Sequence, residues 1–236
     1  MTWQRVALDR LRRVSYIGAG VIAAACAPRL ERLVPAPLAP ATRADAAAWA
    51  AATAPRTPTA VQFRWVYGDE RVRYAGRGMA RVAPPDSLRF DYRGPLGLGV
   101  GAAVVVGDQV VWADPRPSFE SLVPAVPLLW VALGTVPQPA ADAVVFRGGD
   151  APRTIWRYVR GRDTLDFVAT AGATQVLEAE WRQAGAVRAR TRTDYDAHAM
   201  PATARIEFPE AAARFEITVV ARDTLAVFAP QLWRRR

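Results

Sequence analysis

The lone cysteine of this 236-residue chain carries its most reactive side chain. Cys26 ends an uncharged, apolar stretch, residues 14–25, and four arginines lie between residues 5 and 13. A basic region, an apolar run of about 12 residues and small residues before a cleavage site are the parts of a secretory signal. A membrane-spanning helix needs about 20 apolar residues. We therefore expect residues 1–25 to be a cleaved export signal.

A single cysteine cannot form an internal disulfide, so an exported chain must use this thiol differently or leave it free. Ala23-Ala24-Ala25-Cys26 resembles a bacterial lipobox, although Ala23 stands where leucine is usual. In a lipobox the thiol is acylated with diacylglycerol before the signal is removed. We expect Cys26 to be lipidated; the alternative is a buried cysteine in an N-terminal anchor helix. Ala27, where aspartate would retain a proteobacterial lipoprotein in the inner membrane, predicts an outer-membrane anchor facing the periplasm.

Two other groups of residues have spacings that could support chemistry. Asp194, Asp196 and His198 alternate along one strand, and such side chains can bind a divalent cation. His198 is the chain's one histidine, however, and Met200-Pro201 indicates that the strand ends there, which favours a solvated strand end. A serine hydrolase would need the same histidine, and no Gly-x-Ser-x-Gly elbow is present. We predict no metal site, no catalytic residues and no enzymatic activity.

Residues 97–102 match the glycine pattern of a dinucleotide-binding loop. That loop must open a helix, so that the helix N-terminus faces the pyrophosphate. The residues that follow, 103–111, have the pattern of a hairpin instead. We therefore expect no cofactor, and glycines that let the strands bend.

The charge is basic but carried by arginine alone, with no lysine. The formal charge of +9 falls to +6 for residues 26–236, after four arginines and one aspartate leave with the signal. An exported chain does not meet nucleic acid, so the plausible anionic partner is the headgroup layer of a membrane. Most arginines are expected on the solvated faces of strands.

The chain after Cys26 divides into a tether and one folded domain, residues 42–236. Residues 26–41 are proline-rich, which predicts an extended tether that makes no contact with the fold and lifts it from the membrane. Thr42 and Asp45 have the spacing of a helix cap before an alanine-rich run to Thr53, which Pro55 ends.

From residue 60 onward apolar and polar residues alternate with a period of two, which predicts strands with one dry and one wet face. Leu177, Ala179 and Trp181, for example, oppose the polar residues 178, 180 and 182. Turn sequences at 107–108, 148–150, 161–163 and 183–185 predict antiparallel hairpins. The fold class is mainly β with a few helices: an incomplete, curved antiparallel β-barrel of ten or eleven strands.

Residues 118–134 interrupt this alternation and are too apolar for a surface loop. Pro124 and Pro127 should break the segment into two short helices. A sheet that buries one face must close or be covered, so these helices are expected to cover its mouth. Cavity lid and ordinary core plug are equally compatible with the sequence.

The order of these parts resembles the LolB family of outer-membrane lipoprotein receptors, within the LolA/LolB carrier superfamily. The resemblance covers roughly residues 22–225. It rests on the lipidated cysteine, the aromatic-basic strand at 86–93 that leads into Gly94-Pro95-Leu96-Gly97, the two-helix insertion and the closing hairpin that opens with Met200-Pro201-Ala202. Extra glycines after Leu96 and extra prolines in the insertion depart from the family pattern and point to a side branch.

The resemblance implies a half-barrel whose concave face binds acyl chains of lipoproteins or lipids, with a LolA-like carrier as a candidate donor. It also implies that Leu96 protrudes from its turn and enters the membrane; the alternative is a leucine folded onto the core. The expected cavity and lid residues are Phe63, Trp65, Phe90, Tyr92, Leu122, Val126, Leu128, Leu129, Trp130 and Leu133. The alternative function is a structural or envelope-assembly lipoprotein whose core is filled by its own side chains.

Overall fold

The computed structural model describes residues 32–34, 37–94, 99–123, 125–224 and 227–235. Cys26 and Leu96 therefore lie outside the described residues. The described elements belong to one compact unit, Glu31–Arg236, so a chain that begins at Glu31 contains every described strand and the whole described core. Within this part of the chain no helix combines the length and apolarity needed to cross a membrane.

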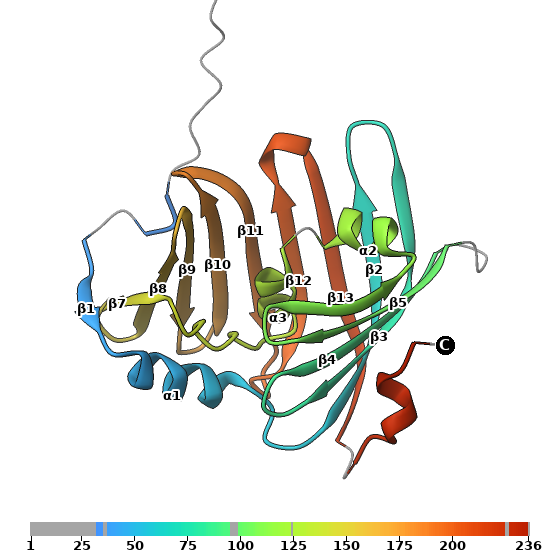
Figure 1. Ribbon diagram of the computed structural model, residues 1–236, viewed down its shortest axis with the longest axis horizontal. Helices are drawn as coiled ribbons and strands as arrows, with labels where there is room; N and C mark the ends of the chain where they lie inside the picture. The colour runs from blue at the N-terminus through green and yellow to red at the C-terminus, as the bar shows by residue number, and fades with distance from the viewer. Residues whose placement is uncertain (1–31, 35–36, 95–98, 124, 225–226, 236) are drawn as a thin grey trace, which may run out of the picture. The chain divides into compact units, whose positions relative to one another are not determined.

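A single curved, antiparallel sheet dominates the described residues and does not close into a barrel (Figure 1). Its strands are β1 (Ala39–Ala41), β2 (Thr59–Gly68), β3 (Arg73–Ala83), β4 (Ser87–Arg93), β5 (Val100–Val106), β6 (Gln109–Asp114), β7 (Val144–Gly148), β8 (Arg153–Arg160), β9 (Asp163–Thr170), β10 (Val176–Gln183), β11 (Ala186–Tyr195), β12 (Pro201–Phe208) and β13 (Ala213–Thr224). The predicted fold class is confirmed. The described sheet has 13 strands rather than ten or eleven, in part because three-residue β1 is too short to show alternation.

The strand order is β1-β7-β8-β9-β10-β11-β12-β13-β2-β3-β4-β5-β6. It consists of two meanders, β2–β6 and β7–β12, joined by β13, which pairs with β12 on one side and β2 on the other. The four predicted hairpin turns are confirmed, since each falls between consecutive paired strands. The last strand of the chain thus holds the two halves of the sheet together.

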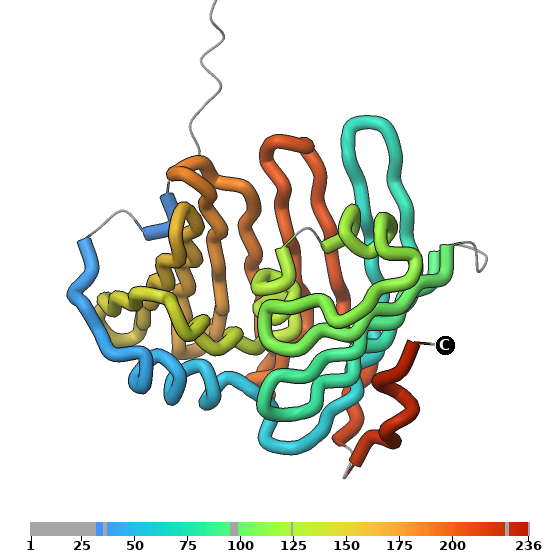
Figure 2. The backbone as a smooth tube through the Cα atoms, in the orientation of Figure 1, coloured from blue at the N-terminus to red at the C-terminus, as the bar shows by residue number. Residues whose placement is uncertain are grey.

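Three α-helices accompany the sheet (Figure 2): α1 (Arg43–Thr53), α2 (Arg116–Leu122) and α3 (Val126–Ala132). Two short 3-10 turns, η2 (Pro209–Ala211) and η3 (Pro230–Trp233), complete the described elements. The predicted cap is confirmed, because the Asp45 backbone N–H donates to the Thr42 hydroxyl at 3.1 Å. The predicted break of the apolar segment into two helices is also confirmed, although Pro127 lies in the first turn of α3, where proline is tolerated, and does not interrupt it.

The concave face of the sheet forms the main core together with α3. The convex face is polar but partly covered, which corrects two expectations. Leu33 and Val34, expected to be free tether, pack against Ile155 and Val168 on the convex side, and β1 pairs with β7. Glu180 and Arg182, expected on a wet face, are 0% and 5% exposed. The end of the predicted tether is therefore part of the fold.

Candidate functional site

The aromatic residues expected to line the cavity lie on the concave face of β2 and β4. Phe63 and Phe90 stack with ring centroids 5.1 Å apart, and Tyr92 and Trp65 continue the layer beside Phe90 and Phe215. All four predicted side chains are at most 5% exposed. They form a packed aromatic layer of the core.

Glycines opposite these rings explain how the layer packs so closely. Gly76 faces Trp65 across the β2–β3 ladder, Gly78 faces Phe63, and Gly101 faces Tyr92 on β5. A Cβ at Gly78 would lie 2.2 Å from the Phe63 ring, and one at Gly101 would lie 2.2 Å from the Tyr92 ring. The rings thus occupy the space over the neighbouring strand that side chains would otherwise fill.

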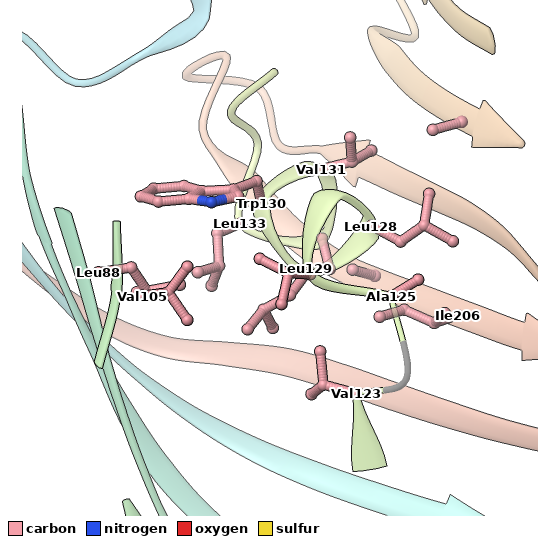
Figure 3. Packing of buried hydrophobic residues seen from close by; sticks show 14 of the residues in the cluster. Leu88, Val105, Val123, Ala125, Leu128, Leu129, Trp130, Val131, Leu133 and Ile206 are labelled. Atoms are coloured by element: carbon pink, nitrogen blue, oxygen red, sulfur yellow. The ribbon is translucent and has the colours of Figure 1, made fainter. Parts of the chain in front are cut away.

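The helix α3 fills the middle of the concave face (Figure 3). Leu128, Leu129 and Trp130 are at most 2% exposed, and Val126 and Leu133 at most 9%. The Trp130 indole donates to the Gly107 carbonyl at 2.7 Å, and the Thr193 hydroxyl donates to the Val131 carbonyl at 2.8 Å. Leu122, at the end of α2, is half-buried against the same core. The described structure therefore presents α3 as a bound plug that contacts β10, β11 and β12.

An apolar cavity of about 300 Å³ remains beside this plug. It lies on the concave side of the sheet, between the start of α3 and the segment 137–143. The end of β8, the start of β9 and the end of β10 complete its walls. The apolar side chains that line it are Ala125, Val126, Pro127, Pro137, Ala140, Ala143, Tyr158, Leu165 and Trp181. Its volume is at the lower end of the range for small-molecule sites.

Tyr158 gives this cavity a buried polar group. Its side chain is 5% exposed and its hydroxyl has no hydrogen-bond partner within the described residues. Burial raises the pKa of the Tyr158 hydroxyl, so the group stays protonated and can donate a hydrogen bond. A buried donor without a partner costs free energy, and this hydroxyl is closed off from solvent.

Arg160 lies at the rim of the cavity and joins two segments across it. Its guanidinium donates to Asp142 at 3.0 Å and to Asp108 at 3.3 Å. The hydrogen bond that Arg160 donates to Asp142 raises the pKa of Arg160, which therefore stays charged. All three side chains are more than 40% exposed, so these pairs are weak and exchangeable. A carboxylate or phosphate could replace either aspartate at this position.

Of the residues predicted from sequence to form the cavity or lid, Val126 is the one that lines this cavity. The sequence did not identify Leu165, Trp181 and Tyr158 as residues that line the cavity. The alternation around residues 177–181 does place Trp181 on the dry face, but alternation carries no information on which end of a strand borders a cavity. That depends on where the 137–143 segment crosses the sheet.

The other candidate groups are placed as follows. Asp194 is bound to Arg192 at 2.8 Å, and the Asp196 carboxylate accepts backbone N–H groups of His198 and Met200 in a turn. Among the described residues no group of three or more His, Cys, Asp or Glu is arranged to hold a metal. The described residues from Val100 onward form the β5–β6 hairpin rather than a helix.

No protein-family model matches the chain, and a search of curated protein sequences finds no relative. Solved structures do match its fold. A LolA superfamily protein from Nitrosomonas europaea aligns with a TM-score of 0.52 over 83% of this chain and 98% of its own, at 9% identity. The fold is LolA-like. A domain named as an outer-membrane lipoprotein-sorting protein from Vibrio parahaemolyticus aligns with a TM-score of 0.52 over 80% of this chain and 97% of its own, at 8% identity. The LolA-like fold does not single out the LolB branch.

Proposed function

We propose that this protein is an outer-membrane lipoprotein, anchored through Cys26, that binds an acyl chain in the reception or transfer of lipoproteins or lipids. The observation that supports acyl binding is the largely apolar cavity beside α3, with Arg160 at its rim. Apolar walls suit a hydrocarbon chain, and the guanidinium suits a charged group at its head. The LolA-like fold of lipoprotein-sorting proteins agrees with this proposal.

The second candidate is a non-enzymatic envelope-assembly lipoprotein with a filled core. The observation that favours it is the burial of α3, since Leu128, Leu129 and Val131 are 0% exposed. The two functions differ in whether the cavity holds a ligand. An acyl-binding protein uses the cavity at Ala140 and Trp181, whereas a scaffold leaves it empty.

Two adjacent alanines provide a matched test of the cavity. Ala140 lines it and Ala141 does not, although both lie in the same segment. With the Glu31–Arg236 chain, titration calorimetry with palmitate should show binding, and saturating palmitate should raise the Tm by mass action. Ala140→Phe should weaken binding at least tenfold because the ring fills the cavity, and Ala141→Phe should bind as wild type. Absence of wild-type binding, or equal losses in both variants, would support the scaffold.

Arg160 allows a second test that depends on the ligand's head. Arg160→Gln should weaken palmitate binding several-fold but leave binding of palmitoyl methyl ester unchanged, because the ester carries no charge for the guanidinium. Equal effects on both ligands would show that Arg160 does not contact the head.

A further inference from the structure

Three arginines lie side by side on the convex face of the sheet, far along the strand order from the Val34 cluster. Arg64 of β2 is opposite Arg77 of β3, and Arg77 is opposite Arg93 of β4. All three are exposed, and their strand neighbours Phe63, Trp65 and Tyr92 point to the concave core. Within the described residues, no carboxylate lies within ion-pair distance of any of them. Like charges directly opposite across strands repel one another.

The convex arginines of β11–β13 differ in this respect. Arg192 binds Asp194 at 2.8 Å, and Arg205 and Arg214 reach Glu216 at 3.4 and 3.5 Å. Asp91, two residues before Arg93 on β4, is held by Arg81 and Arg89 at 2.6 and 2.8 Å. Arg64, Arg77 and Arg93 thus lack the carboxylate partners that Arg192, Arg205 and Arg214 have.

Exposed apolar side chains border the same row of arginines. Val100, which is opposite Arg93, is 54% exposed, and Val72, in the turn where the β2–β3 hairpin extends past the row, is 37% exposed. Exposed Arg73 lies on the same face of β3 as Arg77, four residues before it. Apolar residues next to basic ones suit the boundary between headgroups and acyl chains. A nucleic acid or a free anion would gain nothing from Val72 and Val100.

We propose that this basic corner (Arg64, Arg73, Arg77 and Arg93 with Val72 and Val100) docks on an anionic phospholipid surface. The arginine row binds headgroup phosphates, and Val72 and Val100 enter the interfacial layer. The proposal rests on the envelope location given above but not on acyl binding in the cavity. It assigns an orientation: the β2–β4 corner faces the bilayer.

Vesicle flotation of the Glu31–Arg236 chain tests the proposal. Wild type should float with phosphatidylcholine vesicles that contain phosphatidylglycerol, much less with pure phosphatidylcholine, and less as salt screens the charges. The triple variant R64Q/R77Q/R93Q should bind on the order of 100-fold more weakly, at about tenfold or less per arginine near the surface. The matched control R192Q/R205Q/R214Q loses the same charge from paired arginines on the same face and should retain most of the binding.

Each alternative outcome overturns a definite part of the proposal. Equal losses in both triple variants would show that net charge, not the corner, drives binding. Tighter binding to a single-stranded oligonucleotide than to the anionic vesicles at equal salt would assign the row to nucleic acid, and full competition by inorganic phosphate would assign it to a free anion. Ala140→Phe should float as wild type; its failure to do so would place vesicle binding in the cavity. Melting curves of every variant identify any that fail to fold.

Discussion

Five charged residues form a network on the convex face beneath the N-terminal segment. The Asp166 carboxylate, 0% exposed, accepts from Arg157 at 2.6 Å and from Arg182 at 2.6 Å. Glu180, also 0% exposed, binds Arg190 at 2.6 Å and accepts the Leu33 backbone N–H at 3.2 Å. The network therefore connects four strands, β8 to β11, to a segment that lies 147 residues before Glu180 in sequence.

Removal of one buried carboxylate should lower the free energy of unfolding strongly. Asp166→Ala leaves two partly or fully buried guanidinium groups without their partner, so the free energy of unfolding should fall by about 3–5 kcal/mol. Glu120→Ala, which breaks the exposed pair with Arg116, should change it by less than about 1 kcal/mol. Urea denaturation of both variants measures the difference. Similar small losses would mean that water screens Asp166 despite its burial.

The burial of this network could not be predicted from the sequence. Alternation correctly separates the two faces of β10, because side chains alternate in any strand. It assigns residues 178, 180 and 182 to one wet face, yet Glu180 and Arg182 are buried. The cover comes from Leu33 and Val34, and no local pattern records a contact between such distant segments.

At the level of elements, α3 is held by the sheet through its own carbonyl groups. Thr193 donates to Val131 at 2.8 Å, and Thr191 donates to Leu128 at 3.5 Å. If the proposed acyl ligand carries two chains, a cavity of about 300 Å³ beside α3 should be too small for both, and we expect the helix to move.

Thr193→Val tests this relation, because it removes a donor while keeping the shape of the side chain. Stability should fall by about 1 kcal/mol. Affinity for a single-chain fatty acid should stay the same, whereas affinity for a short diacyl phospholipid should rise several-fold because α3 is released more easily. Calorimetric titration with both ligands measures the two constants, with exposed Thr218→Val as control. An equal change for both ligands would contradict a displaced helix.

Most elements could be predicted from local signals. The cap at Thr42, the glycine turns and the loss of alternation at 118–134 each follow from backbone chemistry that a few neighbouring residues determine. Strand β1 could not, because three residues that include Pro40 show no period. The choice between lid and plug was also open, since it depends on packing of α3 against three strands far along the chain.

For the whole molecule, β13 is the strand on which the assembly of the sheet depends. It joins two meanders, and its Phe215, 0% exposed, lies with its ring 6.0 Å from that of Trp65. Because β13 pairs with β2, which is the second described strand in sequence, the sheet can be completed only when distant parts of the chain meet. Such topologies fold slowly.

Phe215→Ala should therefore destabilise both meanders together. A buried phenylalanine truncated to alanine costs about 3–5 kcal/mol. Hydrogen exchange followed by mass spectrometry should show equal loss of protection in peptides from β2–β6 and from β7–β12. Persistent protection of one meander would mean that it folds independently of β13.

The docking of Leu33 and Val34 has a consequence for the proposed anchor at Cys26. Six residues lie between Cys26 and Leu33, so seven steps of at most about 3.6 Å each give a reach of about 25 Å. If Cys26 is lipidated as proposed, the domain would stay within about 25 Å of the bilayer that holds the anchor, and its ligands would have to reach it there.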